Sequence, residues 1–313
     1  DKVFNYSKKG EAAKNVVVGA PSALLMMATL AVFILSGLHI HGGDESFVSA
    51  EALEYHLPVH GLFLVMAAVF IIVQRRSAQP FLNFGHFKNS QFSMALFSDH
   101  TFHMSMMAVV ILVPILVENG LGYDPIVASW VLIPGQFLGI FLPLIAGYYF
   151  DKSNPRWIRP AGLLAIASGF LMLALFSSSV AIWVLPILLI PAFIGTHTFN
   201  APSNATIMNS LPEDRSFASG VMETSRQMGH TIGVTIAATM LGLALPTGIS
   251  FMTDAQAEPF YRAGFQYAAT AVIFTILTGA LVAAYQTGII GKRYGKASIS
   301  AKEKDTVSAS ADD

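Results

Sequence analysis

Two ionisable side chains lie one helical turn apart inside a long apolar stretch of this sequence: Asp99 and His103, with His100 beside the first. A carboxylate next to an imidazole in a dry site suits proton exchange, because small environmental changes move histidine protonation across neutral pH. The alternative is a local Asp99–His103 hydrogen bond that faces a neighbouring helix. Among the residues of this chain, Asp99 ranks first as a candidate for proton coupling or substrate contact.

A second group of ionisable residues shares one face of a later helix. Glu223, Arg226 and His230 lie at positions i, i+3 and i+7. Arg226 could hold an anionic partner or modulate a titrating Glu223, with His230 deeper in a cavity. The alternative is an internal Glu223–Arg226 ion pair near the helix end, where the arginine simply extends its charge to the surface.

Several further polar residues are weaker candidates. His197, Asn200 and Asn204 could line a cavity or its gate, although such groups more often satisfy broken backbone near Pro202. Gln136 could provide a hydrogen-bonding group in a cavity or join two helices.

Glycines one turn apart form two pairs, Gly135 with Gly139 and Gly229 with Gly233. Faces of this kind allow close helix packing, so we expect pivots and contact surfaces at these positions.

Four histidines flank an acidic loop, but a metal site would need their nitrogens to converge. Their spacing is loose, and we expect no metal: His39, His41, His56 and His60.

The elements that position these residues are long apolar helices. Of 313 residues, 54% are apolar and 12% are charged, which is about half the charged fraction of a soluble domain. Lipid offers no partner for unpaired backbone groups, so each apolar block must be helical. The sequence predicts an all-α integral membrane protein with about eight transmembrane helices: 16–38, 57–73, 92–117, 127–150, 160–176, 180–199, 217–245 and 265–289.

Ionisable groups inside such helices are costly, roughly 2.5–3.5 kcal/mol each at the helix centre, and therefore indicate function. A net charge of −1 does not suggest nucleic acid as a partner, and the absence of cysteine excludes disulfides and thiolate metal sites.

The basic loops predict the orientation. If the spans alternate, every basic loop residue except Arg262 falls on one side, which the preference of Lys and Arg for the cytoplasm assigns to the cell interior. Both termini are then cytoplasmic. Residues 1–14 form a linker, and 292–313 a disordered tail. The chain begins with Asp1 rather than Met, so we expect a fragment.

The loop after the fourth span carries a recognisable pattern, Gly147-Tyr-Tyr-Phe-Asp151-Lys152-Ser-Asn154-Pro155-Arg156. It resembles the G-x-x-x-D-R/K-x-G-R/K-R/K signature that the major facilitator superfamily places between the second and third helices of each half. Asp151 can pair with Arg156 or Arg159 and join two helices, and Gly147 lets them approach. Asn154 replaces the usual glycine, and asparagine tolerates a left-handed turn.

The segment Ser216–Gly233 adds to this resemblance. It is similar to the A-S-G-x-x-N-x-x-R-Q-x-G-x-x-x-G segment of the 14-helix drug:proton antiporter branch, which Gly220, Gly229 and Gly233 match. Glu223 stands where asparagine is usual. The stretches 81–89 and 118–125 fit the same branch.

The resemblance implies a C-terminal six-helix bundle over residues 81–291, made of two inverted three-helix repeats. Residues 15–80 would be the extra helical pair of this branch, and the N-terminal six-helix half would be missing. The implied activity is export of small amphiphilic or toxic molecules in exchange for protons, by alternating access and without a cofactor. The protein would lie in a bacterial inner membrane. Some relatives work with a periplasmic adaptor and an outer-membrane channel, so the resemblance also implies these as partners.

Other functions remain open. The runner-up is an importer or uniporter of a metabolite in the same superfamily. A different class is a histidine-rich membrane metalloenzyme, and a third option is that the helices act alone as a sensor or assembly partner.

Overall fold

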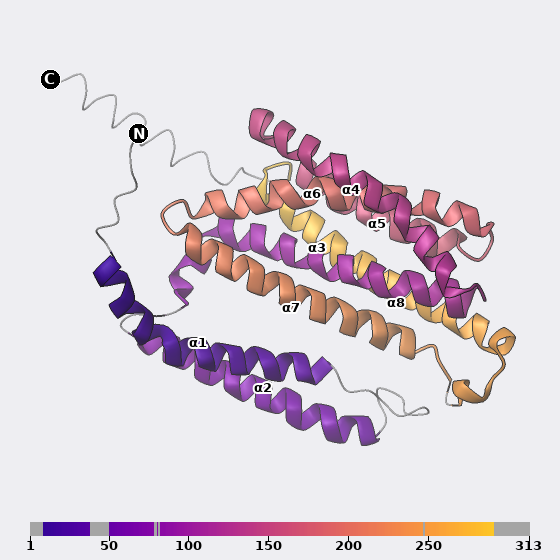
Figure 1. Cartoon of the computed structure of the whole chain (residues 1–313), viewed down its shortest axis with the longest axis horizontal. Helices are drawn as coiled ribbons and strands as arrows, with labels where there is room; N and C mark the ends of the chain where they lie inside the picture. Colours follow the sequence, from indigo (N-terminus) through magenta and orange to yellow (C-terminus); the bar gives the residue numbers. More distant parts are fainter. Residues whose placement is uncertain (1–8, 38–49, 78–79, 81, 247, 291–313) are drawn as a thin grey trace. The chain divides into compact units, whose positions relative to one another are not determined.

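The computed structural model describes residues 9–37, 50–77, 80, 82–246 and 248–290, and this part contains α-helices, short 3-10 and π-helical turns, and no strand (Figure 1). The predicted disordered tail, most of the N-terminal linker, and His39 and His41 lie outside these residues. Eight α-helices follow one another: α1 (Lys9–Gly37), α2 (Ala50–Arg76), α3 (Ser90–Ile115), α4 (Pro125–Ser153), α5 (Ile158–Phe176), α6 (Leu185–Ser210), α7 (Arg215–Gly242) and α8 (Asp254–Gln286).

By length and composition, six of the described helical segments are apolar enough to cross a membrane: Leu53–Arg76, Ser90–Gly120, Pro125–Ser153, Ile158–Phe176, Ile182–Ser210 and Asp254–Gln286. Within α1 the apolar segment Pro21–Leu35 is shorter. The remaining helix, α7, is less apolar because it carries Glu223, Arg226 and His230. The prediction of an all-α membrane protein is confirmed.

The chain divides into two units, residues 1–86 with α1 and α2, and residues 87–313 with α3 to α8. In the first unit α1 packs along α2. In the second, α3 packs against α7 and α8, and α6 packs against α4 and α5. The contacts α3–α6 and α5–α8 join these groups. Exchanging α3–α5 for α6–α8 maps these contacts onto one another, but α7 also packs against α8, whereas α4 and α5 are not packed together in this way.

The core of the second unit lies between α3, α5, α6 and α8. Phe102, Leu163, Phe170, Leu185 and Phe265 are among its fully buried side chains. Burial of such side chains is worth about 1.5–3 kcal/mol each when the alternative is water. In a membrane the surrounding lipid is also apolar, so close packing carries more of the specificity.

Polar caps begin several helices. The Asn89 side chain accepts hydrogen bonds from the backbone at the start of α3, and its amide donates to the Ser210 carbonyl at the end of α6, 2.9 Å away. Asp214 caps α7, and Thr253 forms a capping box with Gln256 at the start of α8. At the end of α4, Asn154 adopts φ 42°, which confirms the predicted left-handed turn.

Several predicted spans were shorter than their helices, and the differences are largest in α6 and α8. α6 continues to Ser210 rather than ending at 199, and α8 begins at Asp254 rather than at 265. Both extensions are more polar than the apolar blocks, so hydropathy alone missed them. A consequence is that Asn204 lies within α6, not beyond its end.

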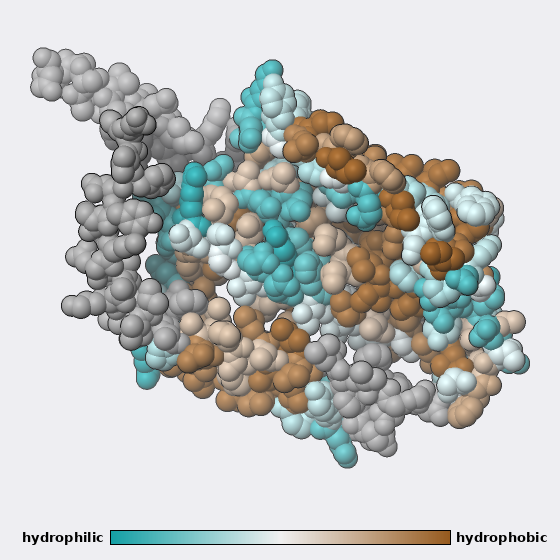
Figure 2. Space-filling view, viewed as in Figure 1, coloured by the Kyte–Doolittle hydropathy of each residue, from teal (hydrophilic) through white to brown (hydrophobic). Residues whose placement is uncertain are grey.

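Hydrophobic side chains cover much of the surface of both units, as the brown areas of Figure 2 show. On α4, the exposed side chains include Trp130, Phe137, Phe141 and Leu144. Only a lipid or protein environment could cover so much apolar surface, in keeping with membrane helices. Figure 2 also shows a hydrophilic patch on the second unit in the region of α7.

Candidate functional site

A network of polar side chains joins α3 to α7. The Nε–H of Arg226 donates to Nε2 of His103 across 3.0 Å, and Nδ1 of His103 lies 3.1 Å from Nε2 of His230. One turn earlier, Nδ1 of His100 lies 2.8 Å from the Ser225 carbonyl oxygen. The two groups of ionisable residues that share helix faces in the sequence therefore meet in one site.

Asp99 lies at the buried end of this network. Its side chain is 0% exposed, and its Oδ2 is 3.7 Å from Nε2 of His103, beyond hydrogen-bonding distance. Within the described residues neither carboxylate oxygen makes a hydrogen bond of normal geometry. The Ser203 hydroxyl on α6, which also lacks one, is the polar group close enough to act on the carboxylate as a donor. An unpartnered buried carboxylate is expensive in its ionised form, so the site favours a group that takes up a proton.

Arg226 connects the buried part of the network to its exposed part. Its guanidinium also donates to Oδ1 of Asn204, 3.3 Å away on α6, and pairs with Oε2 of Glu223 at 3.2 Å. The Glu223 side chain is 52% exposed and accepts a further hydrogen bond from Gln227. The local Glu223–Arg226 ion pair of the sequence analysis is present, but the arginine reaches inward to α3 and α6.

The hydrogen bonds indicate which nitrogen of His103 carries a proton. A guanidinium can only donate, so Nε2 of His103 accepts from Arg226. A neutral His103 then has its proton on Nδ1, where it donates to His230. In this tautomer Nε2 has no proton to give to Asp99. A proton on Nε2 would prevent the hydrogen bond from Arg226 and would allow Nε2 to donate to Asp99. His103 can therefore contact Arg226 or Asp99 through Nε2, but not both.

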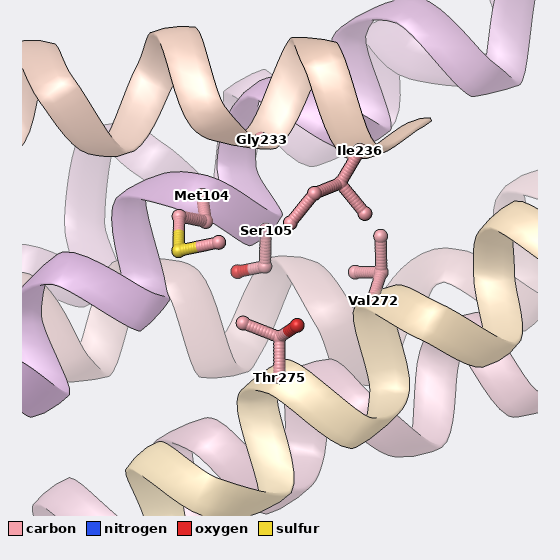
Figure 3. A pocket seen from close by; sticks show the side chains of 6 residues that line it. All are labelled: Met104, Ser105, Gly233, Ile236, Val272 and Thr275. Atoms are coloured by element: carbon pink, nitrogen blue, oxygen red, sulfur yellow. The ribbon is translucent and has the colours of Figure 1, made fainter. Parts of the chain in front are cut away.

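Close helix packing holds this network in place. A side chain at Gly229 would put its Cβ 2.9 Å from the His100 carbonyl oxygen, and at Gly233 it would collide with the Met104 carbonyl. These glycines therefore form the contact surface predicted for them. Beside the network is a small pocket, where residues of three helices converge (Figure 3): Met104 and Ser105 of α3, Gly233 and Ile236 of α7, and Val272 and Thr275 of α8.

The loop between α4 and α5 differs from expectation. Asp151, Lys152 and Arg156 are exposed, and Asp151 forms no ion pair with any residue that the structure describes, so the expected pairing with Arg156 or Arg159 is absent. Arg159 is instead buried in the first turn of α5. A Cβ at Gly147 would meet only the Ala201 side chain of α6, at 3.8 Å, so close approach does not require glycine there.

The other predicted positions are distributed over the second unit. Gln136 is exposed on α4, and it takes no part in the hydrogen bonds of the polar network. His197 places Nε2 3.1 Å from the Gly135 carbonyl, and its ring would be contacted by a Cβ at Gly139, so both glycines face α6 as expected. A Cβ at Gly220 would have no neighbour within 4 Å.

No group of three or more histidine or acidic side chains gathers as a metal site in the described part of the chain. His56 and His60 are one turn apart on α2, and Nδ1 of His60 lies 2.7 Å from the His56 carbonyl oxygen.

Sequence reasoning missed a second buried polar cluster. Arg159 donates to Oγ of Ser98 at 2.7 Å and to Oε1 of Gln286 on α8. The amide of Gln286 donates to the Gln91 carbonyl at 2.8 Å. Ser98 and Gln286 are polar residues inside predicted apolar spans, and this feature of the sequence could have indicated the cluster.

Comparison with known proteins agrees with this architecture. The family model described as Major Facilitator Superfamily matches residues 16–234. The chain is 26% identical over 178 residues to the multidrug efflux pump LfrA of Mycolicibacterium smegmatis, a match that covers 56% of this chain and 35% of that protein. It is 26% identical over 188 residues to multidrug resistance protein 3 of Bacillus subtilis, which covers 59% and 37%. It is also 27% identical over 228 residues to the uncharacterized transporter YebQ of Escherichia coli, which covers 71% and 47%.

These matches span less than half of each relative's own length. The family model, in contrast, covers more than half of this chain, from α1 through most of α7. Helices of membrane-spanning length and the family match lead to the same conclusion: the chain belongs to the Major Facilitator Superfamily of transporters.

Proposed function

We propose that this chain is the C-terminal part of a secondary active transporter that exports small amphiphilic or toxic molecules in exchange for protons by alternating access. Two relatives with efflux or resistance in their names support export. The observation that carries proton exchange is the fully buried Asp99 carboxylate beside His103. Each proton that enters gains about 2.3 kcal/mol per 100 mV of membrane potential.

In this proposal Asp99 is the proton carrier, and His103 with His230 controls access to it. While Nε2 of His103 accepts from Arg226, Asp99 must exchange its proton elsewhere. A proton arriving through His230 and His103 would weaken the Arg226 contact and bring the imidazolium to Asp99. Arg226 also binds Glu223 on the exposed face of α7, so substrate contact there and protonation of Asp99 would compete for the same arginine.

The whole transporter would have residues 81–291 as its C-terminal bundle, residues 15–80 as an added helical pair and an N-terminal six-helix half. It would lie in a bacterial inner membrane with both termini in the cytoplasm, since the basic loops then face inward. Arg262 is the exception, and it is locally paired with Glu258, 2.9 Å away, and with the Gly120 carbonyl. A periplasmic adaptor and an outer-membrane channel are further proposed partners.

We further propose that Gly147, Asp151, Lys152 and Arg156 take part in gating on the cytoplasmic side. In the structure these residues lie at the end of α4 and in the loop before α5. Asp151 is exposed there. For a role in gating, Asp151 would form an ion pair with a basic side chain in another conformation of the chain, or with one on another part of the transporter.

Vesicles that contain the complete transporter test the direction of transport and separate export from the alternative, an importer or uniporter of a metabolite. In inverted vesicles, acidification of the lumen should drive a fluorescent amphiphilic cation into the lumen. Collapse of the pH gradient by a protonophore should stop this movement. Transport that persists without the gradient, or that runs only in the opposite direction, contradicts the proposal.

A further inference from the structure

Arg159 is a buried cation with neutral hydrogen-bond partners. It is 1% exposed, in the first turn of α5. Its guanidinium donates to Oγ of Ser98, to the Ala95 carbonyl at 3.5 Å and to Oε1 of Gln286. It also lies 5.7 Å from the centre of the Phe199 ring. Among the described residues no carboxylate is close enough to form an ion pair with it.

Asp99 directly follows Ser98, which accepts a hydrogen bond from Arg159 at 2.7 Å, and it is itself fully buried, so the carboxylate and the guanidinium are close enough for their charges to interact. A guanidinium keeps its charge in proteins, and burial of one unpaired charge costs several kcal/mol. The carboxylate of Asp99 is the neighbouring charge that can change. The pair is thus asymmetric, with a permanent cation facing a group that can be ionised or neutral.

We infer that Arg159 is the fixed counter-charge of Asp99 and sets the pH at which Asp99 exchanges its proton, an inference that rests on the proposed function. Ser98 and Gln286 hold the guanidinium near Asp99 without neutralising it. When Asp99 is ionised, Arg159 compensates its charge. When Asp99 carries a proton, the neutral acceptors Ser98, Ala95 and Gln286 keep Arg159 satisfied.

The charged and titratable groups around Asp99 come from three helices. His103 is on α3 itself, and α7 contributes Arg226, with Glu223 and His230 behind it. From α6 the neutral Ser203 faces Asp99, and from α5 the cation is Arg159. Arg226 already divides its hydrogen bonds between His103, Asn204 and Glu223. Arg159 forms no ion pair with an acidic side chain in the described chain. Its position relative to Asp99 therefore does not depend on another carboxylate, as that of Arg226 does.

The same cluster links Asp99 to the packing of three helices. Gln286 of α8 accepts from Arg159 of α5 and donates to the Gln91 carbonyl of α3. A change of charge at Asp99 therefore acts on a residue that joins α5 and α8 to α3. Arg159 is a positioning residue in this arrangement, since it acts on the proton through Asp99.

The test compares three variants of the complete transporter, Arg159→Gln, Arg159→Lys and the control Arg215→Gln. The pH dependence of proton-driven transport is measured for each in proteoliposomes. Loss of a nearby opposite charge favours the neutral carboxylic acid. Arg159→Gln should therefore move the half-maximal pH upward, by on the order of one unit. Arg159→Lys should keep the wild-type pH dependence at a lower rate, because lysine retains the charge but not the fork of donors. Arg215→Gln, which removes an exposed positive charge at the start of α7, should leave the profile unchanged.

A wild-type pH profile for Arg159→Gln, even at reduced rate, would overturn the inference, as would equal shifts for the Gln and Lys variants. If Arg159→Gln does not reach the membrane, Arg159→Lys decides alone: an unchanged profile supports a counter-charge and a displaced one refutes it. Asp99→Asn separates the two proposals. If Asp99→Asn abolishes proton coupling while Arg159→Gln keeps the wild-type profile, only this inference fails. If Asp99→Asn retains coupling, both fail.

Discussion

Arg226 on α7 donates a hydrogen bond to His103 on α3 across 3.0 Å, at one turn from the fully buried Asp99. The contact connects a carboxylate that has no hydrogen-bond partner in the described structure to a glutamate on the exposed face of the bundle. Arg226 is therefore a residue through which a change at Glu223 can reach His103 and the neighbouring Asp99.

Replacement of Arg226 by lysine should reduce proton-driven transport roughly 10- to 100-fold, which corresponds to the loss of about 1.5–3 kcal/mol per hydrogen bond to a charged group. A lysine is a single point donor and cannot contact His103, Asn204 and Glu223 together. Initial rates in proteoliposomes measure this effect. Arg215→Lys, at the exposed start of α7, is the matched control. Equal rates for Arg226→Lys and the control would exclude a role for the forked contact.

His230 should matter as the acceptor that fixes the tautomer of His103. His230→Leu removes the acceptor and should lower transport about 2- to 10-fold, the effect of one neutral hydrogen bond. His230→Gln offers a side-chain oxygen near the same place and should retain more activity. The comparison is made at equal expression in the same vesicles. If leucine performs as well as glutamine, the His103–His230 contact has no part in transport.

Gly233 should be intolerant of any side chain, because a Cβ there collides with the Met104 carbonyl of α3. Gly233→Ala should destabilise the protein by about 1–3 kcal/mol, the usual cost of overpacking. Gly220→Ala is the control on the same helix, since a Cβ at Gly220 has nothing within 4 Å. Thermal unfolding of the purified proteins in detergent measures the difference. Equal melting temperatures would show that α3 and α7 are not in close contact at Gly233.

Asp151→Ala should slow turnover with little change in substrate affinity if this residue takes part in gating. The carboxylate is exposed at the end of α4 and is far along the chain from Asp99. The maximal rate and the half-saturating concentration, measured separately in vesicles, distinguish gating from binding. Wild-type kinetics would remove Asp151 from the gating proposal.

Much of the architecture could be predicted from hydropathy, since the eight apolar blocks correspond to the eight α-helices of the described residues. Residue spacing in addition placed Asp99 with His103, and Glu223 with Arg226 and His230, each on one helix face. That the two groups meet could not be predicted, because a contact such as Arg226 to His103 depends on which helices pack together. Gly229 and Gly233 indicated close packing but not the partner helix.

Arg159 is a buried residue that the sequence pattern did not single out. It follows two other basic residues in a loop, and a preference for cytoplasmic charge explains all three equally well. The structure separates them, because α5 begins at Ile158 and its first turn points Arg159 toward Ser98 and Gln286. A local sequence pattern does not contain these distant partners, the second of which is 127 residues away.

Proton release on substrate binding tests the central claim most directly. The complete transporter, purified in detergent in weakly buffered solution, is mixed with a saturating amphiphilic substrate, and the pH of the solution is recorded. The account predicts that the wild-type protein and the exposed control Asp254→Asn release protons, and that Asp99→Asn releases none. Proton release by Asp99→Asn at the wild-type level would contradict the assignment of the proton to this buried carboxylate.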